Sequence, residues 1–108
     1  MTLTAVEEKI QALIDAVIID DVHTVKKLLE SGINPNCTLD SDYITPLHFA
    51  AQNNSWQVIP LLLAAGANIY ARTAEDGVTP LEVARYHKHP KIVALLTTCN
   101  SGCANSPH

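Results

Sequence analysis

The 108-residue chain contains few aromatic residues, few basic residues and only three cysteines. Aromatic residues make up 5% of the chain, so the 47% that is hydrophobic consists mainly of Ala, Leu, Ile and Val. That apolar fraction can build a packed core, which excludes a disordered chain over most of the length. The length is sufficient for one domain and hardly for two.

A long apolar segment is also lacking. The most apolar stretch runs from Ile59 to Ala67 and contains a proline and a glycine. It is much shorter than the roughly 18 residues of a membrane-spanning helix. The first ten residues contain two glutamates and no apolar core of a secretory signal. We therefore expect neither a membrane span nor a secretory signal.

Positive charge is scarce. Seven Lys and Arg residues against eleven Asp and Glu residues give a net charge of −4, which argues against a nucleic acid or an anionic membrane as the partner. Three cysteines are an odd number and too few for a disulfide scaffold, which favours a reducing compartment. We expect a cytoplasmic protein.

The sequence repeats itself with a period of 34 residues. Shifting the chain by one period aligns the dipeptide Thr45-Pro46 with Thr79-Pro80, and Gly32 with Gly66 and then Asn100. The apolar positions align in the same register in three successive units: Leu13, Leu47 and Leu81; Ala16, Ala50 and Ala84; Val25, Ile59 and Val93; Leu28, Leu62 and Leu96. So many coincidences in one register indicate an internal repeat.

Each unit is predicted to form two short helices. In the middle unit, Thr45 is the expected N-cap and Pro46 the first helical residue. Leu47, Ala50 and Ala51 then form a narrow face of mostly small residues that allows close helix–helix approach. Asn53-Asn54 is expected to end this helix, because Asn tolerates the left-handed conformation.

The second helix of the middle unit is expected to begin at Ser55 as N-cap and to end at Gly66. Its apolar positions have helical spacing: Val58, Ile59, Leu62 and Leu63. Pro60 would then fall inside the helix, where it should remove or bend an early hydrogen bond.

The outer units follow the same scheme. In the last unit, Thr79-Pro80 opens the first helix, His89 caps the second with Pro90 at its first position, and Asn100 takes the place of the glycine. The first unit begins with a capping-box pattern at Thr4 to Glu7, and Asp21 is the expected cap of a helix over Val22 to Ser31.

Three stretches carry a family resemblance. ITPLHFAAQNNSWQVIPLLLAAGANIYAR (Ile44 to Arg72) resembles an ankyrin repeat, with its T-P-L-H-x-A-A motif. GVTPLEVARYHKHPKIVALL (Gly77 to Leu96) and LIDAVIIDDVHTVKKLLESGINPNC (Leu13 to Cys37) are similar to further copies, so that the resemblance covers roughly residues 5–99. It implies an all-α solenoid of stacked helix–loop–helix units with projecting hairpin fingers. The first helices and fingers of such a stack line a concave face that commonly binds other proteins.

The predicted domain spans residues 1–100, in units of about 4–38, 39–72 and 73–100, and a flexible tail is expected over 101–108. The first unit has Gln11-Ala12-Leu13-Ile14 in place of T-P-L-H, and Glu82 replaces the motif histidine in the last. Both departures are typical of capping units. Tyr43 stands where Gly77 and the family have glycine, so a positive φ there would be strained.

Candidate metal ligands are Cys99, Cys103 and His108, with His87 and His89 upstream. A structural zinc site needs four ligands, usually as two close pairs. Here the third ligand is the terminal residue and the fourth must come from a helix end. We expect no metal and no other cofactor, with zinc as the alternative.

No catalytic constellation is evident. Cys37 aligns with Ala71, a finger position that requires only a small residue, and the resemblance makes His48 of the T-P-L-H motif structural. Paired acids such as Asp20-Asp21 and Glu75-Asp76 occupy helix starts and turns, where carboxylates are favoured anyway. We expect a non-enzymatic protein.

Two functions remain: a protein-binding module that acts as an adaptor, inhibitor or immunity-type mask, or a structural, self-associating scaffold unit. For the binding module, which we expect to be monomeric, the resemblance places partner contacts at the finger tips and late in each first helix. The expected contact residues are Ile18, Ile19, Ser41, Asp42, Ile44, Gln52, Asn53, Glu75, Asp76, Val78, Tyr86 and His87.

The charges of this surface suggest the nature of the partner. Four acids (Asp40, Asp42, Glu75 and Asp76) lie along the finger edge, no basic residue aligns there, and Tyr86 is a rigid amphipathic anchor. The expected partner has a basic rim around an apolar patch. Alternatively, the acids are ordinary turn residues, and Ile18 and Ile19 pack beneath the first finger.

Overall fold

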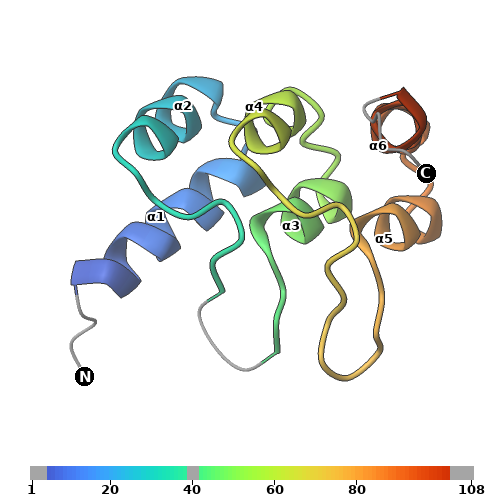
Figure 1. Cartoon of the computed structure of the whole chain (residues 1–108), viewed down its shortest axis with the longest axis horizontal. Coiled ribbons are helices and arrows are strands. Elements are labelled where there is room, and N and C mark those ends of the chain that lie inside the picture. Colours follow the sequence, from blue (N-terminus) through green and yellow to red (C-terminus); the bar gives the residue numbers. More distant parts are fainter. Residues whose placement is uncertain (1–4, 39–41, 103–108) are drawn as a thin grey trace.

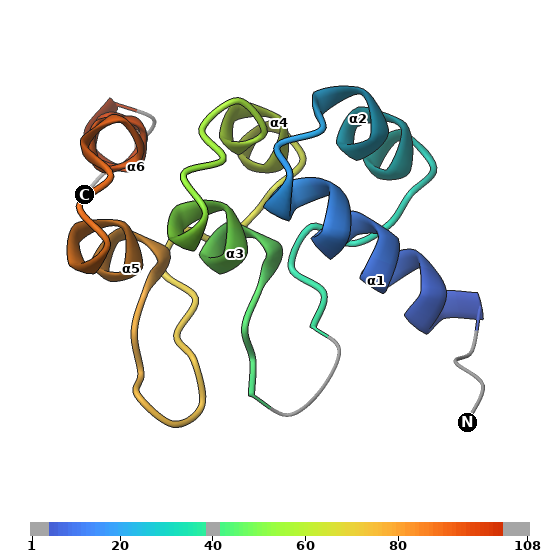
Figure 2. The ribbon, with the colours of Figure 1, turned by 180° about the vertical axis from the view of Figure 1, so that it is seen from behind.

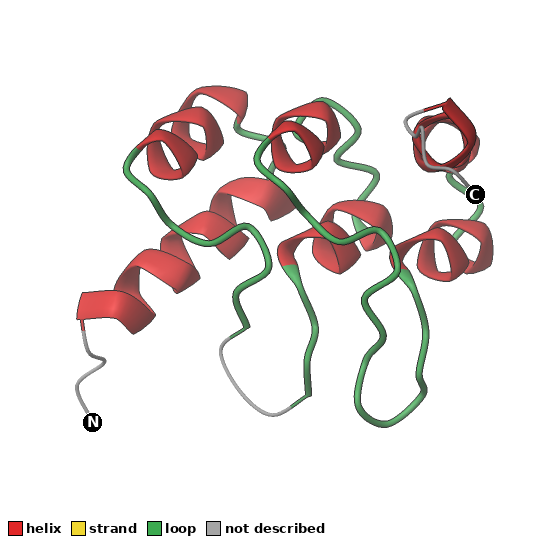
Figure 3. Ribbon diagram, viewed as in Figure 1, coloured by secondary structure: helices red, strands yellow, loops and turns green. Residues whose placement is uncertain are grey.

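The computed structural model describes residues 5–38 and 42–102, which form six helices joined by loops without any strand (Figures 1 and 3). The helices are α1 (Ala5–Ile18), α2 (Val22–Glu30), α3 (Pro46–Gln52), α4 (Ile59–Ala64), α5 (Pro80–Tyr86) and α6 (Pro90–Gly102). The predicted all-α solenoid of three helix pairs is confirmed.

The helices lie in two layers. In Figures 1 and 2, α1, α3 and α5 form the inner layer and α2, α4 and α6 the outer one, with α3 packed between α1 and α5. Two long loops, the first finger (described over residues 31–38 and 42–45) and the second finger (residues 65–79), project from the inner layer on the side away from α2 and α4. The fingers and inner helices together form the concave face.

Local capping fixes where the inner helices begin. Thr45 Oγ1 accepts from the His48 amide at 3.4 Å, and Thr79 Oγ1 accepts from the Glu82 amide at 3.3 Å. In both caps the third helical residue also accepts from the N-cap backbone, which completes a capping box. Asp21 caps α2 through the Thr24 amide, at 3.2 Å. These caps were predicted from the sequence and are confirmed.

Left-handed residues end the inner helices at three positions one period apart. Asp20, Asn54 and Lys88 have φ values of 59°, 57° and 59°. The expected positive φ of Tyr43 is also found, at 58°, where the equivalent Gly77 has 63°. A lysine and a tyrosine in this region are strained, since their Cβ atoms crowd the backbone.

The predicted start of the fourth helix is wrong. Ser55 does not cap it, because its hydroxyl donates to the Ile18 carbonyl at 3.3 Å in the preceding unit. Residues 56–58 form a turn, and the Val58 amide donates to Asp20 Oδ1 at 3.1 Å. The helix therefore starts at Ile59, and Pro60 occupies its first turn, where no helical hydrogen bond is lost.

One expectation near the C-terminus is confirmed and another is corrected. His89 directly precedes α6, its carbonyl accepts from the Val93 amide at 3.1 Å, and Pro90 is the first helical residue as predicted. The His89 side chain lies 3.1 Å from the Gln52 carbonyl. The helix does not end at Asn100 but includes Ser101 and Gly102, which the sequence assigned to a tail. Asparagine is only a weak stop signal, and α6 contains no glycine before Gly102. Thr4 of the expected capping box and residues 103–108 of the predicted tail lie outside the described residues.

Many buried residues of the core occupy equivalent positions of the 34-residue repeat. Leu47, Ala50 and Ala51 of α3 are fully buried, and so are the aligned Leu13 of α1 and Ala84 of α5. Small side chains at this layer allow the inner helices to pack closely. Along the outer layer, the aligned Val25 and Ile59 are buried as well, and so are the aligned Leu62 and Leu96. Each unit thus buries its apolar face against its neighbours, as a solenoid requires.

Candidate functional site

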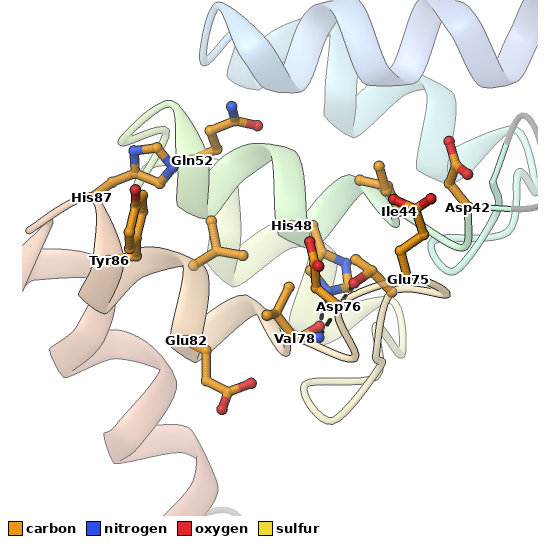
Figure 4. A pocket seen from close by; sticks show the side chains of 12 residues that line it. Asp42, Ile44, His48, Gln52, Glu75, Asp76, Val78, Glu82, Tyr86 and His87 are labelled. Carbon is orange, nitrogen blue, oxygen red and sulfur yellow. Dashed lines mark hydrogen bonds between the residues drawn. The ribbon is translucent and has the colours of Figure 1, made fainter.

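A hollow with a volume of about 690 Å³ opens on the concave face, between the two fingers and the ends of α3 and α5 (Figure 4). Its lining comes from all four segments: Asp42, Ile44, His48, Gln52, Thr73, Glu75, Asp76, Val78, Glu82, Val83, Tyr86 and His87. The volume lies within the range of small-ligand and side-chain pockets, roughly 300–1,000 Å³.

Backbone hydrogen bonds hold the second finger as a hairpin. The Thr73 amide donates to the Val78 carbonyl at 3.1 Å, and the Gly77 amide donates to the Thr73 carbonyl at 3.0 Å. The Ala74 amide donates to the Asp42 carbonyl at 2.8 Å and so joins the two fingers. This framework leaves Glu75 and Asp76 exposed at the finger tip.

His48 lies in the floor of the hollow and connects two units. Its Nδ1 accepts from the Thr45 amide at 3.1 Å, so Nε2 carries the proton and donates to the Val78 carbonyl at 2.9 Å. The side chain is 2% exposed. Desolvation lowers the pKa of His48, outweighing the opposite effect of its hydrogen bond to Val78. This neutral imidazole is therefore a structural bridge, as the resemblance implied.

The charged side chains that line the hollow are predominantly acidic. Four carboxylates line it, those of Asp42, Glu75, Asp76 and Glu82, and neither Lys nor Arg does. One basic residue is nevertheless near: Arg72 Nη1 donates to the Gly77 carbonyl at 2.7 Å, at the base of the second finger. Lys and Arg are therefore absent from the lining of the hollow, although Arg72 belongs to the second finger.

Three rings pack against one another where the C-terminal end of α5 borders the hollow. The ring centroids of Tyr86 and His87 are 5.1 Å apart with the planes at 86°, and those of His87 and His89 are 6.1 Å apart and nearly parallel. His89 Nε2 in turn lies 3.1 Å from the Gln52 carbonyl of α3. Tyr86 is still 82% exposed, so its ring is braced on one side and open to solvent elsewhere.

The hollow brings together eight of the twelve residues predicted from the sequence as partner contacts. It does not include Asn53, Ile18 or Ile19, and Ser41 lies outside the described residues. Ile18 is 37% exposed and Ile19 71% exposed, so most of the Ile19 side chain is open to solvent whereas Ile18 is partly covered. Ile18 is the last residue of α1, and its carbonyl accepts from the Ser55 hydroxyl of the middle unit.

Four lining residues were missed by the sequence analysis: His48, Thr73, Glu82 and Val83. A signal for two of them was present. Glu82 and Val83 precede Tyr86 by four and three residues on α5, and this spacing places side chains on the same face of a helix.

The described part of the chain offers little support for a metal site or for a nucleophilic catalytic residue. No group of three or more His, Cys, Asp or Glu residues there is placed to hold a metal ion. Of the candidate zinc ligands, Cys103, His108 and the side chain of Cys99 lie outside the described residues. Cys37 is half-buried, and desolvation raises the pKa of its thiol, which keeps it in the unreactive protonated form.

Comparison with known proteins identifies the fold family. The sequence profile of ankyrin repeats matches residues 13–106 in three copies. The chain belongs to the ankyrin-repeat family. Ankyrin repeats are protein–protein interaction modules and are generally not catalytic.

Several larger proteins contain similar ankyrin segments. The chain is 38% identical over 76 residues to the potassium channel GORK of Arabidopsis thaliana, which covers 70% of this chain. It is 38% identical over 84 residues to inversin of Canis lupus familiaris, covering 78% of this chain. It is 36% identical over 76 residues to the ARF GTPase-activating protein Git of Drosophila melanogaster, again covering 70%. The matched segments span 8–10% of these relatives' lengths.

Within the described ankyrin units, every helix is too short or too polar to cross a membrane.

Proposed function

We propose that this ankyrin-repeat chain binds a partner protein through its concave face and acts by occupying the partner's surface, as an adaptor, inhibitor or immunity-type mask. The observation that carries the proposal is the hollow between the fingers and α5, which is lined by eight residues expected to contact a partner. Interaction through finger tips and inner helices is also what the family resemblance implies.

The chemistry of the hollow describes the partner. Ile44, Val78 and Val83 supply apolar lining, and the exposed ring of Tyr86 offers an amphipathic anchor of the kind that dominates interfaces. The four carboxylates around them favour a partner with a basic rim around an apolar patch. Complementary charges accelerate association most at low ionic strength.

Several further features belong to the proposal. The net charge of −4 argues against a nucleic-acid partner, and the small number of cysteines favours the cytoplasm. We expect a monomer that needs no cofactor. If light scattering over a dilution series instead shows concentration-dependent association, the scaffold alternative is favoured.

The test uses a partner captured by the wild-type chain and then purified. Tyr86→Ala should weaken binding by about 1 kcal/mol or more, because it removes an exposed anchor that the partner would bury. Asp42→Lys combined with Asp76→Lys should slow association, because it reverses charge at the finger edge. Isothermal titration calorimetry and stopped-flow fluorescence measure the two effects.

Lys26→Ala is the matched control, because Lys26 is exposed on α2 in the outer layer. It should leave both measurements unchanged. The proposed face is wrong if the two concave-face variants bind like wild type while changes at Lys26, or at Trp56 in the turn before α4, weaken binding.

A further inference from the structure

We propose that the end of the stack formed by α5 and α6 is a second interaction surface, which binds an acidic and partly apolar segment of another protein. This end face consists of Leu81, Arg85, Lys88 and Val93. None of these residues lines the hollow, so the surface is independent of the proposed function.

The repeat register places Leu81 and Arg85 on the outward side of α5. The aligned Leu47 and Ala51 of α3 are fully buried, because α5 packs against α3. In the last unit Leu81 is only half-buried and Arg85 is exposed. Figures 1 and 2 show α5 and α6 at one end of the stack, where the described chain leaves this side of α5 uncovered.

Lys88 and Val93 extend the surface toward α6. Asp20, at the position equivalent to Lys88, has the same φ of 59°, and its carboxylate accepts from the Val58 amide of the next unit at 3.1 Å. The same backbone geometry directs Lys88 past the end of the stack. Val93 is half-buried, whereas the aligned Ile59 of α4 is fully buried.

The charge at this end is opposite to that of the fingers. No Asp or Glu follows Glu82 in the sequence, whereas three of the seven basic residues do. The Lys88 amide donates to the Arg85 carbonyl at 3.1 Å, which keeps the two cations about one turn apart. Within the described ranges neither side chain has an ion-pair partner, and Glu82 Oε1 is held by the Thr79 amide at 2.9 Å.

Solubility alone does not explain a lysine at position 88. Asn54 occupies the equivalent position of the middle unit, also with a positive φ, and asparagine adopts this conformation more readily than lysine. Asparagine would therefore supply a polar surface with less strain. A strained residue on an exposed surface points to a role for its side chain, which is here a cation.

The end face fits an acidic protein segment that also carries an apolar side chain. Arg85 can bind a carboxylate through two parallel hydrogen bonds, with Lys88 as a second cation beside it. Leu81 and Val93 offer partly exposed apolar surface next to these charges. A nucleic acid fits less well, because its binding relies on many phosphate contacts and the net charge is −4. A further repeat unit fits poorly, since it would bury the Arg85 guanidinium where the middle unit has Ala51.

The test is a titration of ¹⁵N-labelled protein with the peptide acetyl-Glu-Leu-Glu-Glu-Leu-Glu-amide, followed through backbone amide shifts. We expect saturable shifts centred on Leu81, Arg85, Lys88 and Val93. A peptide with Gln in place of each Glu should bind at least about fivefold more weakly, because it forms no ion pairs. A peptide with Ala in place of each Leu should also bind more weakly, because apolar contact is lost.

Lys88→Asn separates the role of the charge from that of the backbone. It should raise stability by relieving strain and yet weaken peptide binding about two- to fivefold, the value of one exposed ion pair. A purely structural role of Lys88 predicts no loss of binding.

Arg85→Gln keeps a good helix former and should weaken peptide binding by a similar factor. Lys91→Gln is the matched control, because Lys91 Nζ lies 3.9 Å from the ring centroid of Trp56 in the middle unit and so points away from the end face. It should change the affinity less than about twofold, since exposed charges farther away are screened by salt.

The site for an acidic segment is overturned if the Gln peptide binds as well as the Glu peptide, if the shifts centre elsewhere, or if Lys88→Asn binds the peptide like wild type. It is also overturned if a thymidine oligonucleotide binds the same amides more tightly than the peptide does. Concentration-dependent association that Arg85→Glu abolishes would identify the occupant as a second copy of the chain instead.

The hollow is tested separately. The partner captured through the concave face should bind Arg85→Gln and Lys88→Asn like wild type, whereas weaker binding by both would overturn the separation of the two surfaces. If Tyr86→Ala leaves that partner's binding unchanged while the peptide still binds at Arg85 and Lys88, the proposed function falls and the end face stands.

Discussion

His48 Nε2 lies 2.9 Å from the Val78 carbonyl oxygen, and this hydrogen bond ties the start of α3 to the finger of the following unit. The same imidazole accepts from Thr45 through Nδ1. One buried ring therefore secures a helix cap and an inter-unit contact. The cap depends on the ring remaining neutral, because a protonated Nδ1 cannot accept from the Thr45 amide.

Because burial lowers the pKa of His48 below 6.5, acid should destabilise the fold. Below about pH 6.5 the unfolded chain takes up a proton at this residue that the folded state does not bind, so the free energy of unfolding falls. Above that pH this contribution is constant. Urea unfolding of wild type and of His48→Gln from pH 7.5 to 5 measures the difference.

His48→Gln should be less stable at pH 7.5, by about 1–3 kcal/mol, because a buried hydrogen-bonded group is altered. It should also lose stability less steeply toward pH 5. His23→Gln, at an exposed position on α2, is the control and should keep the wild-type slope. Parallel slopes for His48→Gln and wild type would show that His48 does not carry the effect.

Ala50→Leu should lower the free energy of unfolding by about 1–3 kcal/mol, because the larger side chain overpacks a fully buried helix–helix contact. Ala94→Leu introduces the same side chain at an exposed position of α6 and should change stability by about 0.5 kcal/mol or less. Chemical denaturation of the two variants provides the comparison, and equal effects would argue against close packing at Ala50.

Lys88→Gly should raise stability by about 0.5–1 kcal/mol, because Lys88 is held at a φ of 59°. Arg85→Gly, three residues earlier and exposed in α5, should instead lower it by about 1 kcal/mol through loss of helix propensity. We expect the two glycine substitutions to shift the thermal unfolding temperature in opposite directions. A destabilised Lys88→Gly would contradict the assigned backbone conformation.

Deletion of residues 77–108 should abolish cooperative folding. It removes α5 and α6 and so uncovers the face of α3 that contains Leu47, Ala50 and Ala51. Two remaining units cannot bury enough apolar surface for a stable repeat domain. Circular dichroism should show loss of the helical signal, whereas a sharp melting transition in the shortened chain would refute this dependence between units.

The sequence by itself determined the features that depend on local interactions. The 34-residue register, the Thr-Pro caps of α3 and α5, the cap of α2 at Asp21 and the small face of α3 follow from residues a few positions apart. Local chemistry decides such features wherever the chain is placed, because the interacting groups are already neighbours in sequence. The strained Tyr43 was also foreseen, by its alignment with Gly77.

The tertiary structure decided the features that depend on a neighbouring unit. α4 starts at Ile59 because Ser55 and Val58 make hydrogen bonds to Ile18 and Asp20, 37 and 38 residues away. No sequence pattern within α4 indicates that Ser55 and Val58 bind to the preceding unit. The composition of the hollow was decided in the same way, since the packing of α3 against α5 places Glu82 of one unit in the same hollow as Gln52 and His48 of another. Stacking between units selects these partners, because each unit buries its apolar face only against the next.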